Sequence, residues 1–313
     1  MPAIICPLCR QLLQRQAKTW SCALGHSFDV AREGYVNLLP VQHKSSREPG
    51  DSAEMVLARR EFLQAGHYQP LRDAALALLA PLGGHSLLDI GCGEGYYTSA
   101  LTGAAADVTG LDIAKPAIQL AARRFRDITW LVGSAALLPL ADASVDIVCS
   151  LFSQLQIAEM RRVLQAGGHV LVVTPAPDHL WSVREQLFDT VQPHEPDKFL
   201  AGFEDAFELH TRQEVRVSLR LTQQTLRQLL LMTPYAWKAK PEKRAALEES
   251  GSFFTQAAFS LMLLRKLSGF CRAAWGRRCA AQRRRPLAAL LSEERDIVGR
   301  ALARRVALKG DLR

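Results

Sequence analysis

Short apolar runs without polar alternation recur between residues 86 and 175, and helical stretches of about ten residues separate them. Apolar strands joined through helices indicate a parallel sheet that is covered on both faces. A helical pattern over residues 224–232 lies between two further strands. The pattern therefore predicts an α/β fold with a doubly wound, mostly parallel, seven-stranded sheet. The five strands expected in the central region are SLLDI, DVTGLDI, ITWLVG, VDIVCSLF and GHVLVVTP.

The pattern changes on both sides of this region, which divides the chain into four expected parts. A cysteine-rich segment occupies residues 1–36, and residues 37–84 form a polar linker followed by two helices. Pro70 is well placed in the first turn of the second helix. The sheet domain is expected over residues 85–265. Residues 266–313 are rich in Arg and Ala, which predicts a disordered or loosely helical basic tail.

Charge is unevenly distributed along the chain. The whole protein has a net charge of +8, but residues 265–313 carry fourteen Lys or Arg against four Asp or Glu. Residues 1–264 carry twenty-five against twenty-seven, so bulk charge gives no argument that this part binds nucleic acid. No apolar run approaches the roughly 18 residues that a membrane span needs, and no signal peptide is expected. These features predict a cytoplasmic protein with no membrane partner.

The first 26 residues contain three cysteines and a histidine at metal-ligand spacing. Cys6 and Cys9 are separated by two residues, Cys22 follows after twelve more, and His26 follows after three. Thiolate and imidazole groups bind zinc tetrahedrally, and both sulfurs of a Cys-x-x-Cys pair can reach one ion. Four protein ligands leave no open position, so the spacing predicts one structural zinc ion that supplies folding free energy. A redox Cys-x-x-Cys pair is the alternative, but it leaves Cys22 and His26 unexplained.

A glycine-rich loop follows the first strand of the sheet. The sequence LLDIGCGEGYYT places Gly91, Gly93 and Gly95 between a strand and a helix, where backbone amides can approach a ligand closely. A nicotinamide-binding loop requires its third glycine one position later, where this chain has Tyr96. The G-x-G-x-G spacing instead suits S-adenosylmethionine, which has no pyrophosphate. A glycine turn that binds nothing is the alternative.

Two acidic residues accompany this loop. Asp112 ends the second strand about twenty residues later, where a carboxylate can accept hydrogen bonds from ribose hydroxyls. Asp89 opens the loop, and we expect it to order the loop or to contact the amino group of the ligand. Both residues are therefore predicted to belong to the S-adenosylmethionine site, together with the three glycines.

These motifs resemble one family of class I methyltransferases, the bacterial 23S rRNA guanine-N1 methyltransferases of the RlmA type. The resemblance rests on the zinc-ligand spacing, on FDVAREGYVNLLPVQHKSSREPGDSAEMVLARREFLQAGHYQPL and on LLDIGCGEGYYT, and it covers residues 6–265. It implies an N-terminal zinc-ribbon domain for RNA recognition and a methyltransferase sheet. It also implies methyl transfer from S-adenosylmethionine to N1 of a guanine in a hairpin loop of 23S rRNA.

The resemblance implies further site residues and an assembly. By position, Tyr68 in GHYQPL, Gly93, Glu94 and His179 in TPAPDHL are expected to contact S-adenosylmethionine. Members of the family are expected to be homodimers with an RNA-binding cleft between the zinc and catalytic domains. Without the resemblance, Tyr68 would be an ordinary half-buried aromatic residue and His179 a solvent-exposed residue at a helix start.

Other residues are candidates for RNA contact and for proton removal from guanine N1. The proton acceptor is not identified by the sequence, and Asp51 and residues 150–154 are its two candidates. A basic and aromatic surface in the N-terminal part would suit RNA. Its expected members are Arg10, Lys18, Trp20, Lys44 and Arg47.

The chain departs from the family pattern at three places. LFSQLQ replaces a proline-containing segment after the fourth strand, QAGG replaces a K-P-G-G turn, and the tail after Lys266 has no recognised counterpart.

Two other functions are compatible with parts of the sequence. A small-molecule S-adenosylmethionine-dependent methyltransferase would share the catalytic core but has little need for a zinc ribbon. A non-catalytic RNA-binding assembly factor would have no need for an intact glycine loop and Asp112.

Overall fold

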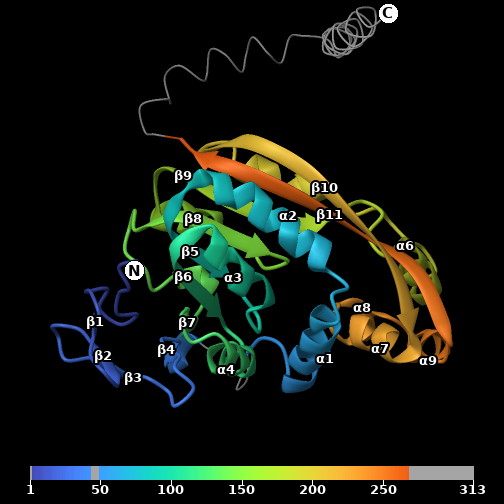
Figure 1. Ribbon diagram of the computed structural model, residues 1–313, viewed down its shortest axis with the longest axis horizontal. Coiled ribbons are helices and arrows are strands. Elements are labelled where there is room, and N and C mark those ends of the chain that lie inside the picture. Colours follow the sequence, from blue (N-terminus) through green and yellow to red (C-terminus); the bar gives the residue numbers. More distant parts are fainter. Residues whose placement is uncertain (1, 44–48, 268–313) are drawn as a thin grey trace, which may run out of the picture. The chain divides into compact units, whose positions relative to one another are not determined.

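The computed structural model describes residues 2–43 and 49–267 of the chain (Figure 1). The predictions for Lys44, Arg47 and residues 268–313 fall outside these described ranges. None of the helices described is long and apolar enough to cross a membrane.

An eight-stranded sheet forms the centre of the described chain, in the order β10-β11-β9-β8-β5-β6-β7-β4. Neighbouring strands are parallel except at β11, which is antiparallel to both β9 and β10. The prediction of a doubly wound, mostly parallel sheet is confirmed, but the expected number of seven strands is wrong. The strands are β4 (Val36–Asn37), β5 (Gly84–Ile90), β6 (Ala105–Asp112), β7 (Thr129–Val132), β8 (Val145–Leu151), β9 (Leu164–Pro175), β10 (Phe207–Thr222) and β11 (Ser252–Lys266).

The additional strand is β4, at the junction of the cysteine-rich segment and the linker. It is two residues long and pairs in parallel with β7, with Val36 opposite Leu131 and Asn37 opposite Val132. The amide of Leu38 donates a further hydrogen bond of 2.8 Å to the carbonyl of Val132. Val36 and Leu38 are both buried. A strand this short has no periodic pattern, so tertiary burial determines it and sequence periodicity missed it.

The described helices either precede β5 or connect strands. α1 (Ala53–Gln64) begins after Ser52, whose side chain accepts a hydrogen bond of 3.2 Å from the amide of Met55. α2 (Gln69–Leu79) has Pro70 in its first turn, as the sequence predicts. The remaining α-helices are α3 (Tyr96–Ala100), α4 (Lys115–Arg124), α5 (Ile157–Val163), α6 (Trp181–Leu187), α7 (Gln223–Leu231), α8 (Tyr235–Lys238) and α9 (Pro241–Glu248).

Apolar residues on the two faces of the sheet form two cores. Leu87 and Ile147 belong to one core, their chain neighbours Leu88 and Val148 belong to the other, and all four are buried. Successive side chains of a strand point to opposite faces, so a strand with both faces buried must be apolar throughout. This explains the unbroken apolar runs in the sequence.

A small antiparallel sheet near the N-terminus forms the ribbon and packs on the larger sheet. Ile4 forms an antiparallel bridge with Leu140, and the amide of Ile5 donates to the carbonyl of Pro139 at 2.9 Å. Trp20 is only 3% exposed and belongs to the core beneath the ribbon. Trp20 is therefore not the exposed aromatic residue that the sequence predicts. The ribbon strands are β1 (Gln14–Arg15), β2 (Thr19–Ser21) and β3 (Ser27–Asp29).

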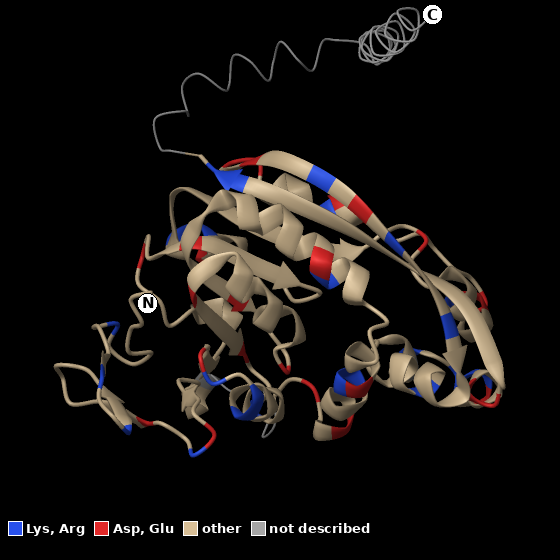
Figure 2. Ribbon diagram, in the orientation of Figure 1, with Lys and Arg blue, Asp and Glu red and all other residues tan. Residues whose placement is uncertain are grey.

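Charged side chains on the long strand β10 are mixed in sign. Figure 2 shows both basic and acidic positions along it, and Arg216 forms ion pairs with both Glu214 and Asp178. This part of the surface therefore offers no basic patch for a nucleic acid, in agreement with the charge distribution of the sequence.

Candidate metal centre and cofactor site

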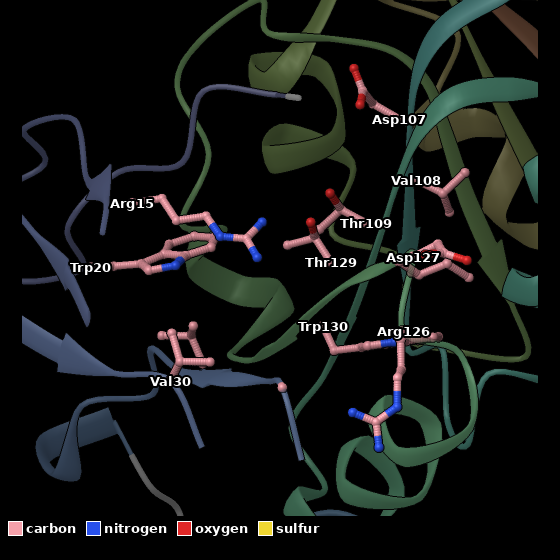
Figure 3. A pocket seen from close by; sticks show the side chains of 13 residues that line it. Arg15, Trp20, Val30, Asp107, Val108, Thr109, Arg126, Asp127, Thr129 and Trp130 are labelled. Carbon is pink, nitrogen blue, oxygen red and sulfur yellow. The ribbon is translucent and has the colours of Figure 1, made fainter. Parts of the chain in front are cut away.

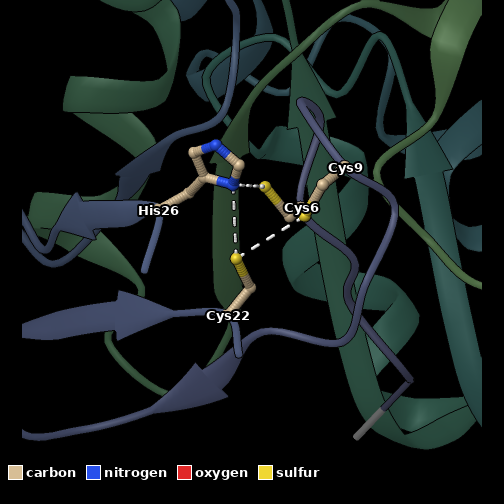
Figure 4. Close-up of side chains that lie close together, drawn as sticks. All are labelled: Cys6, Cys9, Cys22 and His26. Carbon is tan, nitrogen blue, oxygen red and sulfur yellow. Dashed lines mark hydrogen bonds between the residues drawn. The ribbon is translucent and has the colours of Figure 1, made fainter. Parts of the chain in front are cut away.

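Four side chains from two turns of the ribbon converge on one point (Figure 4). The ligand atoms of Cys6, Cys9, Cys22 and His26 all lie within 4.8 Å of one another. The sulfurs of Cys9 and Cys22 are 3.6 Å apart, and Nδ1 of His26 lies 3.4 Å from the Cys22 sulfur and 3.7 Å from the Cys6 sulfur. Zn–S bonds of about 2.3 Å at tetrahedral angles separate two sulfurs by about 3.8 Å, so this donor set fits zinc.

Tight turns place these ligands. The amide of Arg10 donates to the carbonyl of Cys6 at 2.8 Å, and that of Gly25 donates to the carbonyl of Cys22 at 3.0 Å. Arg10 and Gly25 have φ angles of 61° and 82°, and these conformations reverse the chain after Cys9 and after Cys22. Burial opposes ionisation of the Cys22 thiol, but hydrogen bonds from the neighbouring thiol and amides outweigh it and lower its pKa to about 6. The cluster is a closed, structural site.

A polar cavity of about 120 Å³ lies between the ribbon and the amino ends of β6 and β7 (Figure 3). Arg15 of β1 and Arg126 of the loop before β7 line it, together with two acidic side chains, and both arginines are exposed. Nε1 of Trp20 and Oγ1 of Thr109 belong to lining residues, are buried, and have no hydrogen-bond partner within the part of the chain described. Guanidinium groups beside unpaired donors suit a ligand that is rich in hydrogen-bond acceptors.

The glycine loop joins β5 to α3 at the carboxyl edge of the parallel strands. Gly91, Gly93 and Gly95 have φ angles of 73°, 57° and 85°, in the left-handed region that favours glycine. A Cβ on Gly95 would lie 2.7 Å from the ring of Trp130. Trp130 is buried, and its Nε1 donates to the carbonyl of Phe125 at 2.8 Å. The Trp130 ring therefore leaves no room for a side chain at Gly95.

Asp112 lies directly beside this loop. Its Oδ2 accepts a hydrogen bond of 2.8 Å from the amide of Gly93, and its Oδ1 accepts one of 2.8 Å from the amide of Ala114. Burial raises the pKa of the Asp112 carboxyl. Each carboxylate oxygen can accept a second hydrogen bond, so a ribose hydroxyl could still bind here. The structure brings Asp112 and Gly93 together, and the ribose contact stays a prediction.

Asp89 and Glu94 each carry one buried oxygen, Oδ1 and Oε1 respectively, without a hydrogen-bond partner in the described ranges. Their other oxygens accept hydrogen bonds from the Thr98 hydroxyl at 2.6 Å and from the amide of Tyr96 at 2.9 Å. Burial raises the pKa of Asp89 to about 7 and also raises that of Glu94. Buried polar atoms are nearly always paired, so these two oxygens fit a site that receives hydrogen-bond donors from a ligand.

Tyr68 and His179 both pack against Phe259, with ring centroids 4.9 Å from its ring in each case. Tyr68 is buried, and its hydroxyl has no partner within the described residues. Nδ1 of His179 lies 2.8 Å from the carbonyl of Ala258, and burial lowers the pKa of His179 to about 3. Tyr68 is thus not half-buried and His179 is not solvent-exposed, so the exposure expected for each residue without the resemblance is wrong. Their role in cofactor binding stays a prediction.

Arg59 lies beside the glycine loop but was missed by the sequence motifs. A Cβ on Gly93 would lie 3.9 Å from Nη1 of Arg59, and this guanidinium forms an ion pair with Asp51. Asp51, a candidate proton acceptor, is therefore already engaged. The sequence pattern does not distinguish Arg59 from the other basic residues of α1. Its partner Asp51 lies before the helix, outside the helical period.

The segment after β8 contacts the same loop. The hydroxyl of Ser153 donates to the carbonyl of Ile90 at 2.8 Å and lies 2.7 Å from the hydroxyl of Ser150. A Cβ on Gly91 would collide with the Ser153 side chain. The departure LFSQLQ thus places Ser153 directly against the loop that follows β5.

The two sites match separate family models. A model described as RlmA, N-terminal matches residues 4–47, and a methyltransferase domain model matches residues 88–172. A Streptomyces fradiae protein named 23S rRNA (guanine(748)-N(1))-methyltransferase is 33% identical over 77% of this chain and 88% of its own length. A Bacillus subtilis (strain 168) protein, provisionally named 23S rRNA (guanine-N(1)-)-methyltransferase, is 36% identical over 79% of this chain and 91% of its own. A demethylmenaquinone methyltransferase of Tropheryma whipplei (strain Twist) is 34% identical over 39% of this chain and 52% of its own.

Proposed function

The chain belongs to the family of 23S rRNA guanine-N1 methyltransferases, and we propose that it transfers a methyl group from S-adenosylmethionine to N1 of a guanine in a hairpin loop of 23S rRNA. The observation that carries this proposal is the presence in one chain of a four-ligand ribbon and a glycine loop with buried carboxylate oxygens that have no partner among the described residues. The first fits structural zinc, and the second fits S-adenosylmethionine.

S-adenosylmethionine supplies an electrophilic methyl group when it is bound. The residues of the chain must then hold methyl and guanine N1 in line. We assign the ribose hydroxyls to Asp112, and the amino group to the buried acids Asp89 and Glu94. The N1 proton must leave as the new bond forms. Asp51 is paired with Arg59, and the hydroxyls of Ser150 and Ser153 are hydrogen-bonded to each other, so a water molecule is the better candidate for its acceptor.

The RNA is proposed to contact the ribbon and the adjacent cavity. Arg15 and Arg126 at that cavity join Arg10 and Lys18 of the ribbon as cationic groups for phosphates. Consistent with the family resemblance, we propose a homodimer in the cytoplasm that acts on the rRNA hairpin. Sedimentation equilibrium of the purified protein measures the oligomeric state directly.

The test is methyl transfer from labelled S-adenosylmethionine to 23S rRNA isolated from cells that lack the gene. Label in this RNA, with none in RNA from wild-type cells, is the expected result. Reverse transcription then maps the position, because a methyl group on N1 blocks base pairing and stops the enzyme. Absence of label from the unmodified RNA contradicts the proposal.

The two alternatives have separate tests. A small-molecule methyltransferase would label a metabolite extract, but the demethylmenaquinone enzyme covers only 39% of this chain. A non-catalytic assembly factor would show no heat of binding with S-adenosylmethionine in calorimetry. The buried oxygens of Asp89 and Glu94, which have no hydrogen-bond partner in the part of the chain that the structure describes, argue against that outcome.

A further inference from the structure

Phe152 occupies an unusual position directly after β8. It follows the carboxyl end of a parallel strand, the edge at which open α/β sheets bind their ligands. Its neighbour Ser153 donates to the carbonyl of Ile90, the last residue before the glycine loop. The amide of Phe152 donates to the carbonyl of Val173 at 3.0 Å, which fixes the backbone at this point. Phe152 therefore lies next to the proposed cofactor site.

The backbone conformation of Phe152 and the exposure of its side chain both cost folding free energy. Its φ angle is 60°, in the left-handed region that non-glycine residues rarely adopt. The residue is 44% exposed, although its ring packs against that of Phe259 with centroids 5.6 Å apart and against that of Tyr97 at 6.4 Å. Such conformations persist where the surrounding structure fixes them, and they cluster at ligand sites. A partly exposed phenyl group at this edge suits a ligand with an apolar or aromatic face.

We infer that Phe152 is the stacking surface for the target guanine, an inference that rests on the proposed function. A guanine in a hairpin loop must leave the base stack before its N1 can reach a methyl donor. An aromatic side chain at the carboxyl edge replaces the stacking that the base loses. Phe259 and Tyr97 support the ring from within the protein and leave part of its surface for the base.

The test compares four variants on a guanine-containing hairpin that the wild-type protein methylates. Phe152→Ala is expected to lower kcat/KM for the hairpin about 5- to 150-fold, the equivalent of about 1–3 kcal/mol of base stacking. Phe152→Tyr keeps an aromatic face and is expected to stay within about threefold of wild type. Phe152→Leu keeps apolar bulk but is expected to behave like the alanine variant. Phe254→Leu, at another exposed phenylalanine on β11, is the control and is expected to have no effect.

The affinity for S-adenosylmethionine, together with the comparison of the Leu and Tyr variants, separates stacking from other roles. The Kd for S-adenosylmethionine, measured by calorimetry, is expected to stay within twofold of wild type in all four variants. A parallel rise in this Kd for Phe152→Ala would instead mean that the ring covers the cofactor, and equal activity of the Leu and Tyr variants would mean that only bulk matters. Either result overturns the inference. A wild-type protein that methylates no rRNA overturns the proposed function instead.

Discussion

The ribbon and the glycine-loop edge of the sheet both build a site on tight turns, but different forces hold them. In the ribbon, three strands of two or three residues surround four ligand atoms. Beneath the glycine loop, Leu87, Leu88 and Ile90 of β5 are all fully buried. We therefore expect the ribbon to depend on a metal ion for its fold, whereas the hydrophobic core preforms the loop.

The two sites also differ in how they accommodate charge. Zinc neutralises thiolates in the ribbon when it binds. In the loop, burial raises the pKa values of Asp89, Glu94 and Asp112, and two of these carboxyls have an unpaired oxygen in the described structure. Polar atoms left unpaired destabilise a protein until a ligand pairs them. We therefore expect the ribbon to need zinc in order to fold, whereas the glycine loop folds without S-adenosylmethionine and needs it only for activity.

Loss of one zinc ligand is the largest perturbation. Cys9→Ser removes a ligand from a site whose metal supplies about 10–16 kcal/mol in comparable short segments, so the ribbon is expected to unfold. Methylation of rRNA should fall more than 100-fold, while the Kd for S-adenosylmethionine stays within about threefold. His26→Cys is the matched control, because it keeps four zinc ligands and should retain both metal and activity. Equal loss of cofactor and RNA binding in Cys9→Ser would show that the ribbon is integral to the catalytic core.

Removing the Asp89 charge is expected to change the pH dependence of stability. Burial raises the folded pKa of Asp89 from an ordinary 3.8 to about 7, so the contribution of Asp89 to the stability of the ligand-free protein is fully present below pH 4 and is lost as pH rises through 7. The full difference corresponds to about 4 kcal/mol. Asp89→Asn abolishes this decline. Urea unfolding between pH 4.5 and 8 measures the difference between the two proteins.

That difference should grow with pH in favour of Asp89→Asn. His179 and His194 act in the opposite direction, because burial lowers their pKa values to about 3 and about 4. Both histidines are present in both proteins, so their contributions cancel in the comparison. A difference that does not vary with pH would mean that Asp89 ionises normally.

The next largest effect tests whether packing preforms the loop. Gly95→Ala combines φ +85° with a contact of 2.7 Å between its Cβ and buried Trp130, so it should lower the free energy of unfolding by about 3 kcal/mol. The Kd for S-adenosylmethionine should rise at least tenfold. Gly83→Ala is the matched control: its φ is +61°, and nothing lies within 4 Å of its Cβ. It should cost about 1 kcal/mol and leave cofactor binding unchanged.

Sequence patterns predicted the zinc site more completely than the surroundings of the glycine loop, because the zinc ligands lie close together in the sequence. The zinc ligands lie within 21 consecutive residues, so their spacing alone predicts the cluster that the structure contains. The glycines likewise follow a recognisable strand. Asp112, which the motif predicted, accepts a hydrogen bond from the loop. Further side chains beside the loop belong to Arg59, Trp130 and Ser153, which lie in three distant segments. No local sequence pattern identifies these three residues as neighbours of the glycine loop.

Two other errors have the same cause. Trp20 is an isolated aromatic residue in a polar segment, which predicts exposure, yet the ribbon folds it against the sheet. β4 contains two residues and becomes a strand only because β7 offers an open edge. Patterns along a chain reveal periodic elements, whereas both of these features depend on tertiary contacts.

Loss of the Asp112 carboxylate should have a moderate effect that is confined to the loop. Asp112→Ala removes the acceptor for the amides of Gly93 and Ala114, together with the proposed acceptor for ribose. The Kd for S-adenosylmethionine should rise at least tenfold, about 1.4 kcal/mol or more. Asp127→Ala, at an exposed acid before β7, is the control for charge alone. An unchanged Kd in calorimetry would remove Asp112 from the cofactor site.

The smallest expected effect tests whether the ribbon side binds RNA through phosphates. Arg126→Ala removes one exposed guanidinium from the cavity beside the ribbon, so the salt dependence of hairpin binding should weaken by about 0.7 to 0.9 in the slope of log K against log salt. Cofactor binding should not change. Arg220→Ala on β10 is the control, because that strand mixes charges of both signs and should leave the slope intact. If both variants lower the slope equally, RNA contacts extend over the sheet and the ribbon is no longer the distinct RNA-binding region.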